Sequence, residues 1–234
     1  MTSNKHVYQY LTLSIFAAVL VILLVFFGDT KTSTNIDIRV FVGLTFIVCC
    51  ILGILCAKYP GWARRICINI NHKISPSEQV NKKKGKYEGH HPKCNQFKNH
   101  TICIQGRIYC TGCFSLAIGA FVSIIFMSLY IVFFPRFSNY IYYILIFLAF
   151  GIISLCFIEI IIRKRNSTIH VILNSLFVMS FFLITISVIE ITGELIFGFV
   201  AIILSILWLD TRAQLSSWQH GRICAECDKN CKMY

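Results

Sequence analysis

Six long apolar runs constrain this chain more than any other feature of its sequence. A helix needs about 20 apolar residues to cross a bilayer, and six segments approach that length. They are residues 10–27, 40–57, 114–134, 140–162, 169–189 and 195–209. Only 14% of the 234 residues are charged, against about 25% in soluble domains. The sequence therefore predicts an all-α fold, an integral membrane bundle of six transmembrane helices.

The first apolar run, 10–27, has two interpretations. It follows Lys5 near the N-terminus, as the apolar core of a cleavable signal peptide would. However, the run is longer than the core of a typical signal peptide, and no small-x-small cleavage pattern precedes Asp29. We therefore expect a retained transmembrane helix.

Lysine and arginine are distributed unevenly between the connections of these helices. With six crossings, one side holds both termini, the 58–112 loop and the 163–165 loop, and carries 19 of the 22 basic residues. The other side holds Lys31, Arg39 and Arg136. Basic residues accumulate in cytoplasmic connections. We therefore predict a multi-pass protein of the cell membrane with both termini and the 58–112 loop in the cytoplasm.

This topology divides the chain into four parts. They are a first transmembrane hairpin (1–57), a cytoplasmic basic loop (58–112), a four-helix transmembrane segment (113–210) and a cytoplasmic Cys-rich tail (211–234). The lipid bilayer is the expected partner. The net charge of +12 is not taken as a sign of nucleic-acid binding, because the basic KKKGK run at 82–86 has no interleaved aromatic residues. The KKKGK run is interpreted as part of a solvated linker.

Potential metal ligands are concentrated at the end of the 58–112 loop. Tetrahedral zinc needs four cysteine or histidine ligands, commonly including one close pair. The sequence Cys110-Thr111-Gly112-Cys113 supplies such a pair, and Gly112 is expected to relieve backbone strain in the turn between the two cysteines. The loop is therefore predicted to form a small metal knuckle. The preferred ligands are His91, Cys94, Cys110 and Cys113, with His90 and His100 as alternatives.

A second group of ligands closes the chain. The spacing H-x3-C-x2-C-x3-C again offers four residues suited to zinc; they are His220, Cys224, Cys227 and Cys231. Loop and tail can form two separate sites or one joint site, and two sites are favoured. Zinc is preferred to an iron–sulfur cluster because histidines suit zinc better. Disulfides are disfavoured in the reducing cytosol.

A few polar residues interrupt the apolar runs. Glu159 is expected to pair with Arg163 four residues later, and His170 and Asn174 stand one helical turn apart. These residues either extend a polar pocket below the metal site or make ordinary interhelical hydrogen bonds. Glu190 and Glu194 are expected in a turn that water reaches. Small residues recur every four positions at Ser115, Gly119 and Ser123, a pattern that favours close helix packing.

The segment 89–120 resembles a group of small multi-pass membrane proteins, mainly archaeal, that share a domain of unknown function. Their common stretch runs HHPxC, then a spaced Phe and His, then CxGC at a helix start. Here it is His90-His91-Pro92-Lys93-Cys94, Phe97, His100, Gly106 and Cys110-Thr111-Gly112-Cys113. The resemblance implies that the loop cluster is the shared feature, and it implies no activity.

Three functions are compatible with these patterns. The first is a structural or accessory subunit, or an adaptor, of a membrane complex, carrying a cytoplasmic zinc site and no catalytic residues. The second is a membrane thiol–disulfide oxidoreductase that uses Cys110 and Cys113 with a quinone. The third is a transporter or metal-sensing regulator, although the sequence has no detectable inverted repeat. A non-enzymatic role is preferred.

Overall fold

The computed structural model describes residues 4–28, 35–58, 87–88, 100–104, 107–133, 137–162 and 166–225. These ranges contain six helices long and apolar enough to cross a membrane. They are α1 (Asn4–Phe27), α2 (Ile36–Lys58), α4 (Thr111–Phe133), α5 (Asn139–Ile161), α6 (Ser167–Thr192) and α7 (Leu195–Ala225). The expected all-α membrane bundle is confirmed. Helices suit this environment because lipid offers no hydrogen-bond partner to an open backbone.

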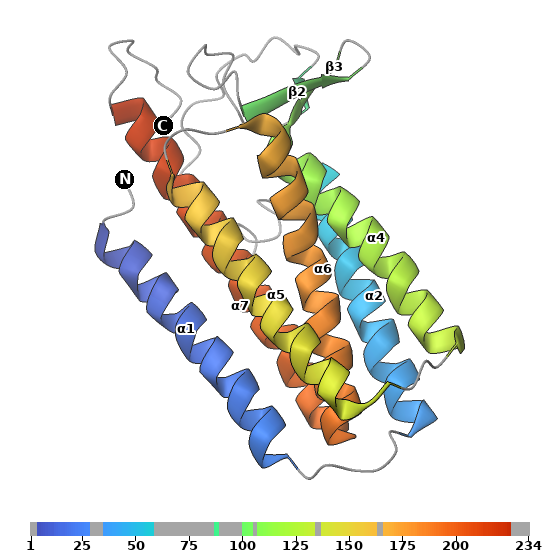
Figure 1. Cartoon of the computed structure of the whole chain (residues 1–234). Helices are drawn as coiled ribbons and strands as arrows, with labels where there is room; N and C mark the ends of the chain where they lie inside the picture. The colour runs from blue at the N-terminus through green and yellow to red at the C-terminus, as the bar shows by residue number, and fades with distance from the viewer. Residues whose placement is uncertain are drawn as a thin grey trace, which may run out of the picture.

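Helix α6 is the centre of the bundle. Helices α4 and α5 make their most extensive contacts with it, and α7 also packs against it. Helix α2 lies on α4, and α1 lies on α7. Figure 1 shows that α1 begins and α7 ends at the end of the bundle where the strands lie. This end is called the sheet end below.

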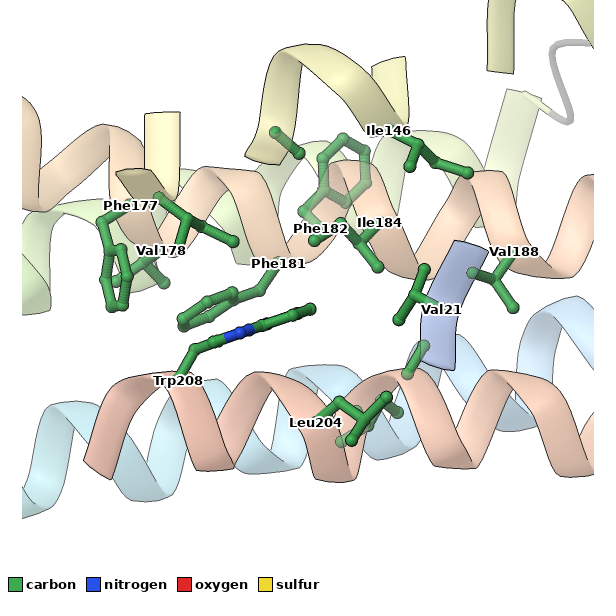
Figure 2. Close-up of a cluster of buried hydrophobic side chains, with 14 of the residues drawn as sticks. Val21, Ile146, Phe177, Val178, Phe181, Phe182, Ile184, Val188, Leu204 and Trp208 are labelled. Atoms are coloured by element: carbon green, nitrogen blue, oxygen red, sulfur yellow. The ribbon is translucent and has the colours of Figure 1, made fainter. Parts of the chain in front are cut away.

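Aromatic and branched side chains fill the interior of the bundle, and α6 contributes more of them than any other helix. Figure 2 shows part of this core. Phe181 stacks on Trp208, with ring centroids 6.4 Å apart, and Phe177 lies edge-on to Phe181 at 4.7 Å. The Trp208 Nε1 donates to the backbone carbonyl of Ser14 at 3.1 Å. This bond attaches α1 to α7 inside the bundle, where the indole N–H would otherwise lack a partner.

The small residues of α4 meet α6 directly. A Cβ atom added to Gly119 would lie 2.5 Å from the backbone oxygen of Ser175. The Ser175 hydroxyl in turn donates to the carbonyl of Ser115 at 3.0 Å. Ser115, Gly119 and Ser123 are all buried. The close packing predicted from this row is therefore confirmed, and α6 is the neighbouring helix.

Local signals fix both ends of α6. At its start, the Asn166 side chain accepts a hydrogen bond from the backbone N–H of Thr168 at 3.0 Å, which satisfies one of the free donors of the first turn. At its end, Gly193 takes a left-handed conformation with φ 62°, and its N–H bonds to the carbonyl of Ile189. Glycine adopts this conformation without strain. The chain then turns into α7.

Two features depart from the predicted organisation. A small sheet of order β1-β3-β2 is present, with β1 (Tyr87–Glu88) parallel to β3 (Arg107–Cys110) and β2 (Thr101–Ile104) antiparallel to it. Helix α7 also continues to Ala225 instead of ending near 209. Residues 211–225 of the expected tail are thus helical.

Candidate functional site

The hairpin of β2 and β3 leads straight into α4 and sets the position of two cysteines. Cys110 is the last residue of β3, where it pairs with Thr101. Helix α4 begins at the next residue, so Cys113 lies in its first turn. Cys110 is buried, and the two side chains are close enough to hydrogen-bond to each other. The two cysteines of the predicted Cys-x-x-Cys pair therefore lie close together where β3 passes into α4.

Gly112 has a different role from the one expected. It does not relieve a turn, since it lies inside α4 and its φ is not in the left-handed region. A Cβ atom at this position would be 2.8 Å from Nη2 of Arg212. The missing side chain therefore makes room for a guanidinium that α7 brings to the start of α4.

Two histidines from distant parts of the sequence meet at the same end of the bundle. His100 directly precedes β2, and His220 lies near the end of α7. Both are buried, each only 6% exposed. Their ring centroids are 5.2 Å apart with an interplanar angle of 71°. The loop and the tail, each predicted to carry ligands, are thus in direct contact through one imidazole from each.

The other predicted ligands are only partly covered by the described ranges. Position 224 lies in α7, one turn after His220. Five residues lie outside the described ranges: His90, His91, Cys94, Cys227 and Cys231. Among the residues that the structure describes, no group of three or more His, Cys, Asp or Glu side chains is arranged to hold a metal ion. The described part therefore contains two pairs of predicted ligands, one of thiols and one of imidazoles.

A buried polar network extends from Arg212, beside the start of α4, into the bundle. Arg212 donates through Nε to Oδ1 of Asn174 at 2.8 Å. The Asn174 amide donates to the carbonyl of His170 at 2.6 Å, and Nδ1 of His170 lies 2.8 Å from Oε2 of Glu159. Asn174, His170 and Arg212 are at most 7% exposed. Helices α5, α6 and α7 are joined by this chain of contacts.

Part of this network was predictable from the sequence. Glu159, His170 and Asn174 were expected either to extend a polar pocket or to make ordinary interhelical hydrogen bonds, and the structure shows contacts of the second kind. The described partner of Glu159 is His170, whereas the expected partner, Arg163, lies outside the described residues. Arg212 was missed, because it was counted only as a basic residue of the tail. Its spacing, four residues after Trp208 and three before Leu215, was the available signal, since both neighbours are buried.

A second buried polar group lies at the opposite end of the bundle. Arg39, in the first turn of α2, forms a 2.7 Å ion pair with Glu190 near the end of α6. The Tyr130 hydroxyl of α4 donates to the other carboxylate oxygen. Glu190 was expected in a turn that water reaches, and this was wrong, since it is only 8% exposed. This group joins three helices and contains no metal-ligand pair.

The sheet end therefore combines a thiol pair, an imidazole pair and a buried guanidinium. Thiolate sulfur and imidazole nitrogen are the ligands that zinc prefers. A thiol pair at a helix N-terminus also has the placement typical of reactive cysteines. Both metal binding and thiol chemistry are thus compatible with the geometry. Comparison of the chain with protein-family models, with curated proteins and with solved structures finds no match.

Proposed function

We propose that the sheet end carries a zinc centre shared by the 58–112 loop and the C-terminal segment, on the cytoplasmic side of the membrane. The centre fastens both segments to the bundle, and the protein acts as a structural or accessory subunit, or an adaptor, of a membrane complex. The contact between His100 and His220 carries this proposal. It joins the two segments that the sequence marks as ligand-rich.

The separation of the two rings agrees with a shared ion. Zinc–nitrogen distances of about 2.0–2.1 Å in a tetrahedral site put the centroids of two bound imidazoles about 5 Å apart. The 5.2 Å separation of His100 and His220 fits that value. A plain edge-to-face ring pair has the same range of separations, so metal content has to decide between the two.

The thiol pair supports the same proposal. Two thiolates on one tetrahedral zinc, each about 2.3 Å from the metal, lie about 3.8 Å apart. Cys110 and Cys113 are close enough to hydrogen-bond, so binding would need little rearrangement. The predicted ligands outside the described ranges could complete the coordination of either the thiol pair or the imidazole pair. The imidazole pair has one histidine from the 58–112 loop and one from the C-terminal segment, so a joint centre is favoured over two independent sites.

Metal analysis of the detergent-purified chain tests the proposal. The wild type is expected to hold zinc, and His100→Gln and His220→Gln should each lose about one equivalent. The double variant should lose no more than either single variant, because both residues bind the same ion. His6→Gln is the matched control, since His6 is exposed on α1. Zinc-free wild type, or full zinc in both single variants, would contradict the proposal.

The placement of Cys110 and Cys113 favours a second candidate, a thiol–disulfide oxidoreductase. In that reaction the two thiols form a disulfide and pass two electrons and two protons to a quinone, which becomes a quinol. Incubation of the metal-free protein with a soluble quinone would then consume two thiols in the wild type. Cys110→Ser should abolish this loss and Cys56→Ser, at an exposed position on α2, should not. Unchanged thiols in the wild type would dismiss this candidate.

A further inference from the structure

Arg212 is a buried cation beside the start of α4. Its residue is only 7% exposed. Its Nε donates to Oδ1 of Asn174 on α6 at 2.8 Å, and its Nη2 lies 2.8 Å from the position that a Cβ atom of Gly112 would take. Gly112 is the second residue of α4. The guanidinium, carried by α7, is thus held against the first turn of a 23-residue helix.

The charge of Arg212 is not balanced by a carboxylate in the described part of the chain. The ion pairs described there do not include Arg212, and its hydrogen-bond partner is a neutral amide. A buried charge that lacks a counter-charge is costly. The start of α4 adds to this cost, because a helix N-terminus carries partial positive charge. The arrangement therefore favours an anion beside the guanidinium.

The hydroxyl of Thr111 is a second group that calls for a partner at this place. Thr111 is the first residue of α4 and is fully buried, and within the described ranges its hydroxyl has no hydrogen-bond partner. A threonine inside a helix can donate to the carbonyl four residues earlier, as Thr211 does to Leu207 at 3.0 Å. Thr111 has no preceding helical turn to accept its proton. Its hydroxyl therefore needs an acceptor from outside the helix.

We propose that Arg212, Thr111 and the N-terminus of α4 form a binding site for a phosphate group. The first four N–H groups of a helix have no partner within it, and phosphates bind at such termini. A phosphate group has several acceptor oxygens, so it can accept from the guanidinium, the hydroxyl and the N–H groups together. Neither side chain is among the proposed metal ligands, so this site does not rest on the metal centre.

The position of the site agrees with a phosphate at the membrane surface. The candidate membrane span of α4, Thr111–Phe133, begins at the proposed site. The ends of a spanning helix lie near the polar headgroups, and basic sites between transmembrane helices bind headgroup phosphates. A lipid headgroup and free inorganic phosphate offer the same chemistry here, so the experiment is designed to separate them.

Calorimetric titration of the detergent-purified full chain tests the site, with inorganic phosphate and short-chain phosphatidic acid as the two probes. The wild type is expected to bind saturably. Arg212→Gln should weaken binding about 10- to 100-fold, the usual effect of losing a hydrogen bond to a charged group. Thr111→Val keeps the shape of the side chain and should weaken binding about 2- to 10-fold. Without phosphate, Thr111→Val should unfold at the wild-type temperature, since the hydroxyl gives up no described hydrogen bond.

Arg222→Gln and Thr168→Val are the matched controls. Arg222 is an exposed arginine of α7, stacked on Trp218 with 4.8 Å between its guanidinium carbon and the ring centroid. Thr168 is an exposed threonine in the first turn of α6. Both variants should bind phosphate as the wild type does. Sodium chloride at matched ionic strength controls for general screening of charge.

The two probes identify the source of the phosphate. Tighter binding of phosphatidic acid than of inorganic phosphate, lost in Arg212→Gln, would support the site with a lipid headgroup as its ligand. Equal affinities would support it with free phosphate. A wild type that binds neither probe saturably would overturn the site, as would wild-type affinity in both Arg212→Gln and Thr111→Val. Either of these last results would leave the proposed metal centre standing.

Discussion

Arg39 and Arg212 are both buried arginines, and they lie near opposite ends of the bundle. Arg39 faces the carboxylate of Glu190, with the hydroxyl of Tyr130 on the same carboxylate. Arg212 instead faces the start of α4, where Gly112 leaves room for its Nη2, and donates to the amide oxygen of Asn174. A carboxylate partner makes the first a stabilising contact between helices. The described hydrogen-bond partner of Arg212 is a neutral amide, and the contact joins α7 to α6.

The ion pair of Arg39 and Glu190 yields a prediction about stability. Glu190→Gln removes the counter-charge and leaves Arg39 buried, so we expect a loss of about 3–5 kcal/mol of unfolding free energy. Thermal unfolding in detergent measures this loss. Replacing both residues with methionine should restore much of it, because no charge is then left unpaired.

Asp37→Asn is the control for this prediction, since Asp37 is exposed on the same turn of α2. It should unfold close to the wild-type temperature. If Glu190→Gln were as stable as Asp37→Asn, the ion pair would have no part in holding α2 to α6.

Helices in lipid associate through close packing, because apolar surface gains little by leaving one apolar medium for another. The contact of α4 with α6 follows this principle. It is built on Gly119, where the two backbones come so close that no side chain fits. This contact also fixes the position of α4, whose first turn carries Cys113, relative to the helix that carries Asn174.

Gly119→Ala should therefore separate these helices. Its Cβ would lie 2.5 Å from a backbone oxygen of α6. Overpacking of this kind lowers the unfolding free energy by about 1–3 kcal/mol. The measurement is the unfolding temperature in detergent. Gly151→Ala is the matched control, because a Cβ at Gly151 of α5 meets nothing within 4 Å. Equal stability of the two variants would disprove the close contact.

The helical elements could be predicted from the sequence because an apolar run of bilayer length leaves a chain few alternatives. The continuation of α7 was missed because Arg212, Gln219 and His220 look like the start of a polar tail, although all three are buried. The sheet was missed because four-residue strands carry little periodicity. The Cys-x-x-Cys pair was predictable from its spacing. The contact of His100 with His220 was not, because it depends on how α7 packs beside the hairpin.

In the whole molecule, the bundle brings together segments that lie far apart in the sequence. Helix α1 begins, α7 ends and the sheet lies at one end of the bundle (Figure 1). The start of α1 and the end of α7 at the same end of the bundle agree with an even number of membrane crossings. The positive-inside pattern predicts that this end is cytoplasmic. A reducing compartment would keep the thiols available to a metal ion.

Reporter fusions test this orientation. Green fluorescent protein at the C-terminus should fluoresce, and alkaline phosphatase at the same position should be inactive. Both results should reverse when the reporters are placed between α4 and α5. The opposite pattern would put the thiol pair on the oxidising side, where the oxidoreductase becomes the better explanation.

The central claim is that loop and tail share a metal ion, and X-ray absorption at the zinc edge tests it most directly. The zinc-loaded wild type is expected to show both sulfur at about 2.3 Å and nitrogen at about 2.0–2.1 Å. His220→Gln, which is expected to lose this ion, should show a correspondingly weaker zinc edge. A shell of sulfur alone, or a spectrum that His220→Gln leaves unchanged, would contradict the claim.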